Sequence, residues 1–202
     1  TAVTTVTATD ADTPAQNLAF SISGGADHGL FTIASGTGVL SFLAAPDFET
    51  PTDTGTDGVY DVQVTVTDDG TGSLTDVQDI AVTVTNENEA PTITSAAAVN
   101  ATENQTAVID VNSTDPDGTV EGSGGLTYTI TGGDDGGVFS IDANTGVLTF
   151  DAAPDFETPG DNNGDNVYDV QVTVSDPGGL TAVQTIAVTV TNEVEGTVFF
   201  QA

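Results

Sequence analysis

The sequence predicts an all-β protein made of two tandem Greek-key β-sandwich domains, and three observations support this prediction. Apolar and polar residues alternate with a period of two within residues 59–66 and again within residues 80–84, as in strands with one buried face. Valine- and threonine-rich runs are separated at short intervals by glycine, aspartate, asparagine and proline, a turn pattern typical of sandwiches. No segment has a helical period of useful length, and the whole pattern occurs twice.

The internal repeat sets the domain organisation. Residues 31–68 return 108 positions later as residues 139–176, and roughly two thirds of these positions are identical. Residues 74–89 then match residues 180–195. We therefore predict one domain over residues 1–89 and a second over residues 90–195. Residues 196–202 remain as a tail or as the start of a further domain.

The second repeat accounts for seven strands and the first for only six. In the first repeat, residues 1–10 align with residues 106–115, which hold the second strand of the other repeat. The first repeat therefore lacks its first strand, and the unpaired sheet edge invites another strand. The seven strands predicted in the second repeat are residues 92–99, 108–113, 126–131, 138–141, 147–150, 167–175 and 181–191.

The composition excludes several classes of function. The chain has 31 Asp and Glu residues, no Lys or Arg and a formal net charge of -31, so it repels nucleic acid and anionic membrane surfaces. It contains no apolar run long enough to span a bilayer. It also contains no cysteine, which leaves oxygen atoms as the main metal ligands and favours hard cations such as Ca²⁺.

Acidic motifs recur at the ends of the predicted strands. Each repeat has Asp-x-Asp after its second strand, Asp-Phe-Glu after its fifth and a single Asp at the end of its sixth. Only His28 offers these carboxylates a cationic side chain, so a cluster of them would need an external cation. The motif residues are Asp10, Asp12, Asp47, Glu49, Asp68, Asp115, Asp117, Asp155, Glu157 and Asp176.

Two further segments lie between these motifs. Residues 86–91 read Asn-Glu-Asn-Glu-Ala-Pro and place Asn86, Asn88 and Glu89 between the repeats. Glu103 stands near the start of the second repeat in the tetrapeptide Ala-Thr-Glu-Asn. Together with the repeated acidic motifs, these segments resemble cadherin repeats, the bacterial cadherin-like variety in particular. The linker resembles the family's Asp-x-Asn-Asp-Asn-x-Pro motif shortened by one residue, and Glu103 resembles the glutamate of its Pro-Glu-Asn motif.

The resemblance implies a fragment of a large secreted or surface adhesin whose repeats are joined by Ca²⁺. The ends of strands gather at the two poles of a sandwich, so each junction is expected to combine motifs from two repeats. The middle junction would use Asp47, Glu49, Asn86, Asn88, Glu89, Asp115, Asp117 and Asp176. Asp10, Asp12 and Asp68 would serve a preceding repeat, and Glu103, Asp155 and Glu157 a following one, with Asn192 and Glu195 as the outgoing linker. The first repeat has no counterpart of Glu103, which weakens the expected middle junction.

The function predicted from these features is a calcium-dependent structural and adhesive module on the cell surface or outside the cell, not an enzyme. Its expected partners are neighbouring repeats of the same chain and like modules on another cell, in homophilic adhesion, or other subunits. One alternative is a filament or surface-layer subunit in which the apolar tail, residues 197–202, completes a neighbour's open sheet edge. A second alternative is a module that binds surface glycans.

Three remaining features have simpler interpretations. Residues 161–166 resemble the start of an EF-hand loop, but position twelve is Val172 instead of glutamate, so a turn is expected. His28 has no repeated counterpart and is expected at the surface. Tyr60 and Tyr168 precede the same strand motif in both repeats and are expected to pack in the sandwich cores.

Overall fold

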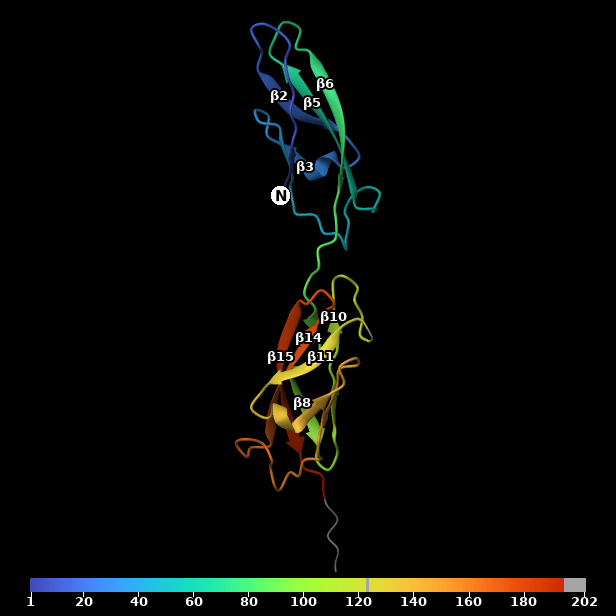
Figure 1. Cartoon of the computed structure of the whole chain (residues 1–202), viewed down its shortest axis with the longest axis vertical. Helices are drawn as coiled ribbons and strands as arrows, with labels where there is room; N and C mark the ends of the chain where they lie inside the picture. The colour runs from blue at the N-terminus through green and yellow to red at the C-terminus, as the bar shows by residue number, and fades with distance from the viewer. Residues whose placement is uncertain (123, 195–202) are drawn as a thin grey trace, which may run out of the picture. The chain divides into compact units, whose positions relative to one another are not determined.

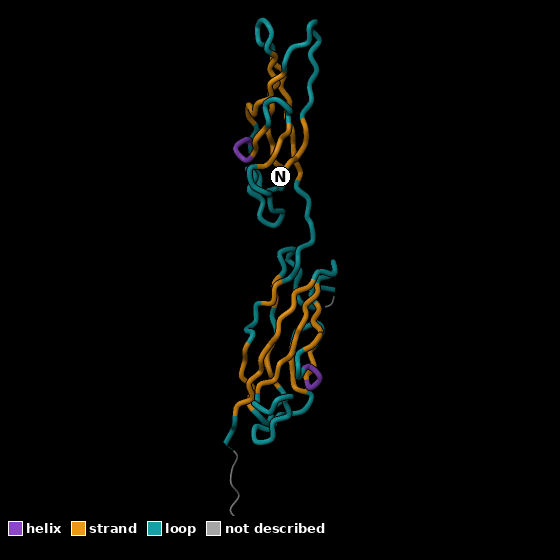
Figure 2. Tube along the Cα trace, turned by 90° about the vertical axis from the view of Figure 1, so that its left-hand side faces the viewer, coloured by secondary structure: helices purple, strands orange, loops and turns teal. Residues whose placement is uncertain are grey.

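The computed structural model describes residues 1–122 and 124–194 and contains two compact units. Unit 1 comprises residues 1–87, and unit 2 begins at Asn88. Strands dominate both units (Figure 2), which confirms the all-β prediction. Within the described part of the chain, helical structure is confined to single 3₁₀ turns at His28–Leu30 and Gly136–Val138. No helix there is long and apolar enough to cross a membrane.

Unit 1 is a sandwich of two three-stranded antiparallel sheets (Figure 1). The strand order is β1-β4-β3 in one sheet and β2-β5-β6 in the other. β6 therefore pairs with β5 on one side and forms an edge of its sheet on the other. The strands are β1 (Ala2–Thr5), β2 (Leu18–Gly24), β3 (Phe31–Ile33), β4 (Val39–Phe42), β5 (Val59–Asp68) and β6 (Thr75–Thr83).

Unit 2 repeats this plan and adds strands to it. Its larger sheet has the order β11-β14-β15-β8, in which β8 runs parallel to β15, and its second sheet has the order β12-β13-β9. A short pair, β10-β7, completes the unit. The strands are β7 (Thr92–Ile93), β8 (Ala98–Thr102), β9 (Ala107–Asp110), β10 (Ser113–Thr114), β11 (Thr127–Gly132), β12 (Phe139–Ile141), β13 (Val147–Phe150), β14 (Val167–Ser175) and β15 (Thr181–Thr191).

The beginning of unit 2 differs from the prediction. Residues 92–99 were predicted as one strand, but β7 and β8 are separate strands that pair with β10 and β15 respectively. A single straight strand cannot pair with both partners, so the chain leaves one pairing at Ile93 and enters the other at Ala98. Residues 108–113 are divided in the same way between β9 and β10.

Aromatic side chains form the centre of each core in the same geometry. Phe31 and Phe42 stack with ring centroids 4.5 Å apart, and Tyr60 meets Phe42 edge-on at 5.1 Å. Unit 2 has the same cluster in Phe139, Phe150 and Tyr168, with separations of 4.5 and 5.2 Å. Each tyrosine hydroxyl also accepts a backbone N–H eight residues upstream, from Thr52 at 3.2 Å and from Gly160 at 2.9 Å. The expected packing role of the two tyrosines is confirmed.

Candidate metal centre

Three carboxylates of unit 2 meet at the ends of β8 and β15. Glu103 directly follows β8 and is fully buried. Asp155 and Glu157 lie in the loop between β13 and β14. One carboxylate oxygen from each of the three residues lies within 4.8 Å of the others. The structure therefore brings these three predicted residues together.

Backbone amides hold Glu103 in place as an anion. Its Oε1 accepts the N–H of Glu193 at 2.7 Å, and its Oε2 accepts the N–H of Phe156 at 2.9 Å. The hydrogen bonds from Phe156 and Glu193 lower the pKa of the Glu103 carboxyl below its ordinary value, although burial acts in the opposite direction. Glu103 is consequently charged at neutral pH.

The other two carboxylates are oriented by their own loops. Asp155 Oδ1 accepts the N–H of Thr158 at 2.9 Å, and Glu157 Oε1 accepts a hydrogen bond from the Asn192 side chain. The chain contains no Lys or Arg to neutralise this group. Like charges at such separations repel strongly, especially away from water. A hard cation would turn this repulsion into attraction, and carboxylate oxygens are its preferred ligands.

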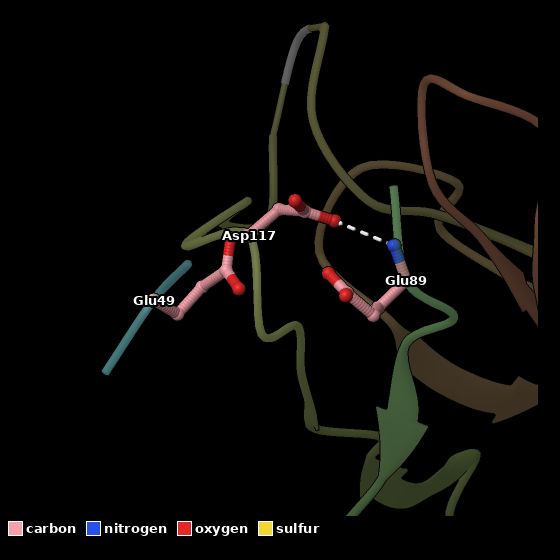
Figure 3. A group of neighbouring side chains, drawn as sticks. All are labelled: Glu49, Glu89 and Asp117. Atoms are coloured by element: carbon pink, nitrogen blue, oxygen red, sulfur yellow. Dashed lines mark hydrogen bonds between the residues drawn. The ribbon is translucent and has the colours of Figure 1, made fainter. Parts of the chain in front are cut away.

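A second acidic group of unit 2 gathers the linker residues with the Asp-x-Asp motif (Figure 3). The backbone N–H of Glu89 donates to Asp117 Oδ2 at 2.9 Å. The N–H of Asp117 in turn donates to Asp115 Oδ1 at 2.9 Å. The second oxygen of Asp115, Oδ2, is buried and has no hydrogen-bond partner among the residues the structure describes. Such an orphaned anionic oxygen suits a metal ligand.

Asp176 joins Asn88 to this group. Asp176 is only 6% exposed, and its two oxygens accept the Asn88 side-chain amide at 2.7 Å and the N–H of Leu180 at 2.8 Å. Burial would raise the pKa of Asp176, but these hydrogen bonds together lower it. Gly178 makes room for the linker, because a Cβ atom there would lie 2.5 Å from Asn88 Oδ1.

Unit 1 places its own Asp-x-Asp residues in one pocket. Asp10, Asp12 and Asp68 contribute to the lining of a cavity of about 240 Å³. Asp10 accepts the N–H of Asp12 at 2.8 Å, and Asp68 accepts the N–H groups of Gly70 and Leu74 at 3.0 and 3.1 Å.

Asp47 and Glu49 form a compact turn elsewhere in unit 1. Asp47 Oδ1 accepts the N–H of Glu49 at 2.9 Å and that of Thr50 at 3.0 Å. The hydrogen bonds from Thr50 lower the pKa of Asp47. Asn86 follows β6 at the end of the unit. Glu195 and residues 196–202, the predicted outgoing linker residue and tail, lie outside the described residues.

Sequence reasoning missed one pair of buried aspartates. Asp27 is 5% exposed and accepts the backbone N–H groups of Thr54 at 2.7 Å and Asp61 at 2.8 Å. Asp135, which is 8% exposed, holds the matching loop of unit 2. Burial raises the pKa of Asp27, but its hydrogen bonds from Asp61 and Thr54 outweigh this effect and lower it. The spacing of 108 residues between the two aspartates, shared with the other repeated motifs, was the available signal.

The segment that resembles an EF-hand loop is a turn, as predicted. Asp161 is buried, and its two oxygens accept the N–H groups of Asp165 at 2.9 Å and Asn166 at 3.1 Å. The matching turn of unit 1 is built around Asp53 in the same way. His28 is exposed, with Nδ1 2.8 Å from the carbonyl oxygen of Gly25, as expected for a surface imidazole. These carboxylates organise the backbone of their turns.

With this geometry established, comparison with known proteins gives the family. The family model described as "Cadherin domain" matches residues 1–85 and 95–191. The chain therefore belongs to the cadherin domain family, as its motifs predicted. Cadherin domains are typically extracellular, calcium-binding adhesion modules without enzymatic activity.

Relatives and solved structures agree with this assignment. The chain is 38% identical over 135 residues to Halomucin of Haloquadratum walsbyi, covering 64% of this chain and 1% of that protein. It is 34% identical over 167 residues to human Protocadherin Fat 4, covering 77% of this chain and 3% of that protein. The chain thus spans only a few per cent of the length of these relatives.

Among solved structures, mouse Cadherin-23 EC22-24 matches with a TM-score of 0.55 at 23% identity over 96% of this chain and 59% of that one. Protocadherin Gamma B2 extracellular cadherin domains 1-5 match with a TM-score of 0.53 at 19% identity, covering 89% of this chain and 34% of that one. These structures support the tandem sandwich fold.

Proposed function

We propose that this chain is a calcium-dependent adhesive and spacer module, in which Ca²⁺ ions bound at the poles of the sandwiches stiffen an extended extracellular array. The observation that carries the proposal is the cluster of Glu103, Asp155 and Glu157. Three carboxylates gather within 4.8 Å of one another, one of them fully buried, in a chain without Lys or Arg. An external cation is the available source of compensating charge.

The ligand set favours calcium over other metals. Carboxylate and amide oxygens from several loops suit the six to eight ligands that Ca²⁺ takes, whereas Mg²⁺ requires a near-octahedral set and keeps several waters. Without Cys, and with a single His in the chain, the usual ligands of zinc are almost absent. Extracellular modules bind Ca²⁺ with dissociation constants of roughly 10⁻⁴–10⁻³ M, and we expect that range here.

The order of motifs along the chain supports a further part of the proposal, a calcium site shared by the two repeats. We propose that Asp47 and Glu49 share Ca²⁺ with the linker and the acidic group of unit 2. The linker residues are few, and the hydrogen bonds of Asn88 and Glu89 already tie it to that group.

A stiffened array of repeats could both bind other cells and act as a rigid spacer. The chain covers 1–3% of Halomucin and Protocadherin Fat 4, so both relatives are far longer than these two repeats. We propose that neighbouring repeats and like modules on other cells are the partners, and that the chain acts outside the cell.

Calcium titration tests the proposal residue by residue. Glu157→Gln and Asp155→Asn remove charge from exposed positions and should each weaken one class of sites about tenfold or more in calorimetry. Asp134→Asn is the matched control, because it removes one exposed carboxylate of unit 2 that lies outside both acidic groups. Equal titration curves for all three variants would contradict the assigned ligands.

Small-angle scattering tests the mechanical consequence. At fixed ionic strength, millimolar Ca²⁺ should make the chain longer and more rigid than either Mg²⁺ or a chelator does. A profile that is unchanged by Ca²⁺ would mean that the carboxylates are a solvated surface, and the proposal that Ca²⁺ stiffens the array would be abandoned.

A further inference from the structure

Asn166 ends the turn of residues 161–166, directly before β14, and ties three segments of unit 2 together. Its backbone N–H donates to Asp161 Oδ1 at 3.1 Å, and its carbonyl oxygen accepts the N–H of Val190 on β15 at 2.8 Å. Its side-chain Nδ2 donates to the carbonyl oxygen of Phe156 at 3.0 Å. The residue has a left-handed backbone with a φ of 64°, which asparagine adopts more readily than most residues. Asn166 therefore connects the turn and β15 to the loop that contains Phe156.

Phe156 is the central residue of the Asp-Phe-Glu motif, and both of its backbone groups are held. Its N–H donates to Glu103 Oε2 at 2.9 Å, and its carbonyl oxygen accepts the Asn166 amide. The first bond orients the peptide group shared with Asp155, and the second orients the peptide group shared with Glu157. Because a peptide group is planar, holding its carbonyl oxygen also constrains the nitrogen and Cα of the next residue. Asn166 thus helps to set where the backbone of Glu157 lies relative to Glu103.

The side chain of Asn166 is committed to this contact. Its Oδ1 atom is buried and has no hydrogen-bond partner among the residues the structure describes. The reverse orientation of the amide would place Oδ1 against the carbonyl oxygen of Phe156, and two acceptors form no hydrogen bond with each other. A buried acceptor without a partner costs free energy. The side chain therefore keeps an unfavourable group buried while it holds Phe156.

Several other side chains of the turn bond within the turn or at its exit. Asn163 Nδ2 donates to Asp165 Oδ2 at 3.0 Å, and Asp165 Oδ1 accepts the N–H of Val167 at 2.9 Å. Asp161 is buried and accepts the N–H groups of Asp165 and Asn166. These contacts shape the turn, whereas the Asn166 side chain links the turn to the carboxylate cluster.

Unit 1 builds the same turn without this side chain. Gly58 stands at the position of Asn166, 108 residues earlier, and also has a left-handed backbone, with a φ of 75°. Its N–H donates to Asp53 Oδ1 at 3.1 Å, and its carbonyl oxygen accepts the N–H of Val84 at 2.9 Å. A glycine thus reproduces the backbone contacts of Asn166. The asparagine side chain is therefore not needed to form the turn, and its contact with Phe156 has another role.

We propose that Asn166 is a positioning residue for the carboxylate cluster of unit 2, which comprises Glu103, Asp155 and Glu157. Its side chain holds Phe156 so that the three carboxylates converge on one cation. This inference rests on the calcium site proposed above and adds to it a residue that does not itself bind the ion. Replacing a residue that orients metal ligands through hydrogen bonds typically lowers metal affinity by roughly 10–100-fold.

Asn166→Gly in the full chain tests the proposal, because a glycine supports the same backbone in unit 1. In chelator, the NMR amide signals of Phe156 and Glu157 should shift, and the Phe156 amide should exchange faster with solvent. Asn162→Ala is the matched control, since it removes an exposed amide side chain of the same turn and should match the wild type at both amides. Unchanged Phe156 and Glu157 signals in Asn166→Gly would overturn the proposal.

Calcium titration of the same variants tests the consequence for the site. In Asn166→Gly, binding followed through the amide signal of Glu193 should weaken about tenfold or more. Binding followed through the amide signal of Glu89, in the other acidic group of unit 2, should keep its wild-type strength. Equal affinity at Glu193 in Asn166→Gly and wild type would overturn the proposal, and so would weakening of both sites by the same factor, which indicates a general loss of structure.

The two measurements separate this inference from the proposed function. A wild-type chain that binds no calcium would overturn the proposed function, and with it the metal-related role of Asn166. The spectra in chelator report the contact between Asn166 and Phe156 independently of any ion. Calcium binding by the wild type together with an unaffected Asn166→Gly variant would overturn the inference alone.

Discussion

Units 1 and 2 share the geometry of their aromatic centre, but the sheet that contains β6 has three strands, whereas the sheet that contains β15 has β8 as a fourth. The rings of Phe31, Phe42 and Tyr60 reproduce the stacking of the unit 2 cluster to within about 0.2 Å in centroid separation. The identical residues 80–87 and 186–193 nevertheless differ in burial, and only the second copy pairs with β8. The local sequence thus suffices to form the strand, whereas the burial of its apolar side chains depends on the neighbouring strand.

The largest difference is expected when the same isoleucine is truncated in both units. Ile186→Ala removes a fully buried side chain and should cost about 2–5 kcal/mol. Ile80→Ala removes a partly buried one and should cost roughly 1–2 kcal/mol. Urea unfolding followed by backbone NMR signals of each unit measures both values. Equal costs would show that β8 does not complete the core.

Proline substitution at equivalent positions of β15 and β6 should give different losses of stability in the two units, through backbone hydrogen bonds alone. Thr189 lies between β14 and β8 in the register, and its amide faces β8. Thr189→Pro should cost about 1–3 kcal/mol, because a ladder hydrogen bond is lost and a carbonyl of β8 is left unpaired. Thr83→Pro should cost less than about 1 kcal/mol, since proline is tolerated on edge strands. The same unfolding experiment measures both, and a large cost at Thr83 would mean that this edge is already paired.

The sequence was sufficient where local pattern decides the outcome. β14 and β15 have their predicted bounds, residues 167–175 and 181–191, because strict alternation over a long run leaves one register. The resemblance to cadherin repeats also anticipated that Glu103 would lie near Asp155 and Glu157. That these residues bind a metal ion stays a prediction.

The failures of sequence reasoning arise from tertiary structure. The predicted strand 92–99 was wrong because β7 and β8 join different sheets, and apolar periodicity does not report which partner a strand pairs with. Asp27 was missed as a buried residue because one of its donors, Asp61, lies 34 residues away. Its neighbours in the sequence are typical of an exposed turn.

Another difference between the units lies at the hydroxyl of Tyr128. Unit 1 has Phe20 and Ala8 where unit 2 has Tyr128 and Ser113, and the Tyr128 hydroxyl contacts Ser113 Oγ and donates to Glu121. Burial and the hydrogen bond to Glu121 raise the pKa of Tyr128 to about 12, so the hydroxyl stays a donor.

Tyr128→Phe should destabilise unit 2 by roughly 1–1.5 kcal/mol, because these hydrogen bonds are lost. Phe20→Tyr is the reciprocal change and should not stabilise unit 1, since Ala8 offers no partner. Thermal unfolding of the two variants provides the measurement. A stabilising Phe20→Tyr would show that the difference lies elsewhere.

The contribution of Glu103 to the pH dependence of unit 2 stability should be the smallest of these effects. Hydrogen bonds from Phe156 and Glu193 lower the pKa of Glu103, so its stabilising contribution is complete above the ordinary glutamate pKa of about 4.3 and is lost as the pH falls through the lowered folded-state value. Asp155 and Glu157 face the same carboxylate, so the experiment is done in chelator to keep bound cation from adding its own pH dependence.

Urea midpoints between pH 6 and pH 3 should fall less steeply for Glu103→Gln than for the wild-type chain, while Asp134→Asn should follow the wild type. Parallel curves for Glu103→Gln and wild type would mean that the two backbone amides hold a carboxamide as well as a carboxylate, and that the charge of Glu103 is retained for its ligand and not for the fold.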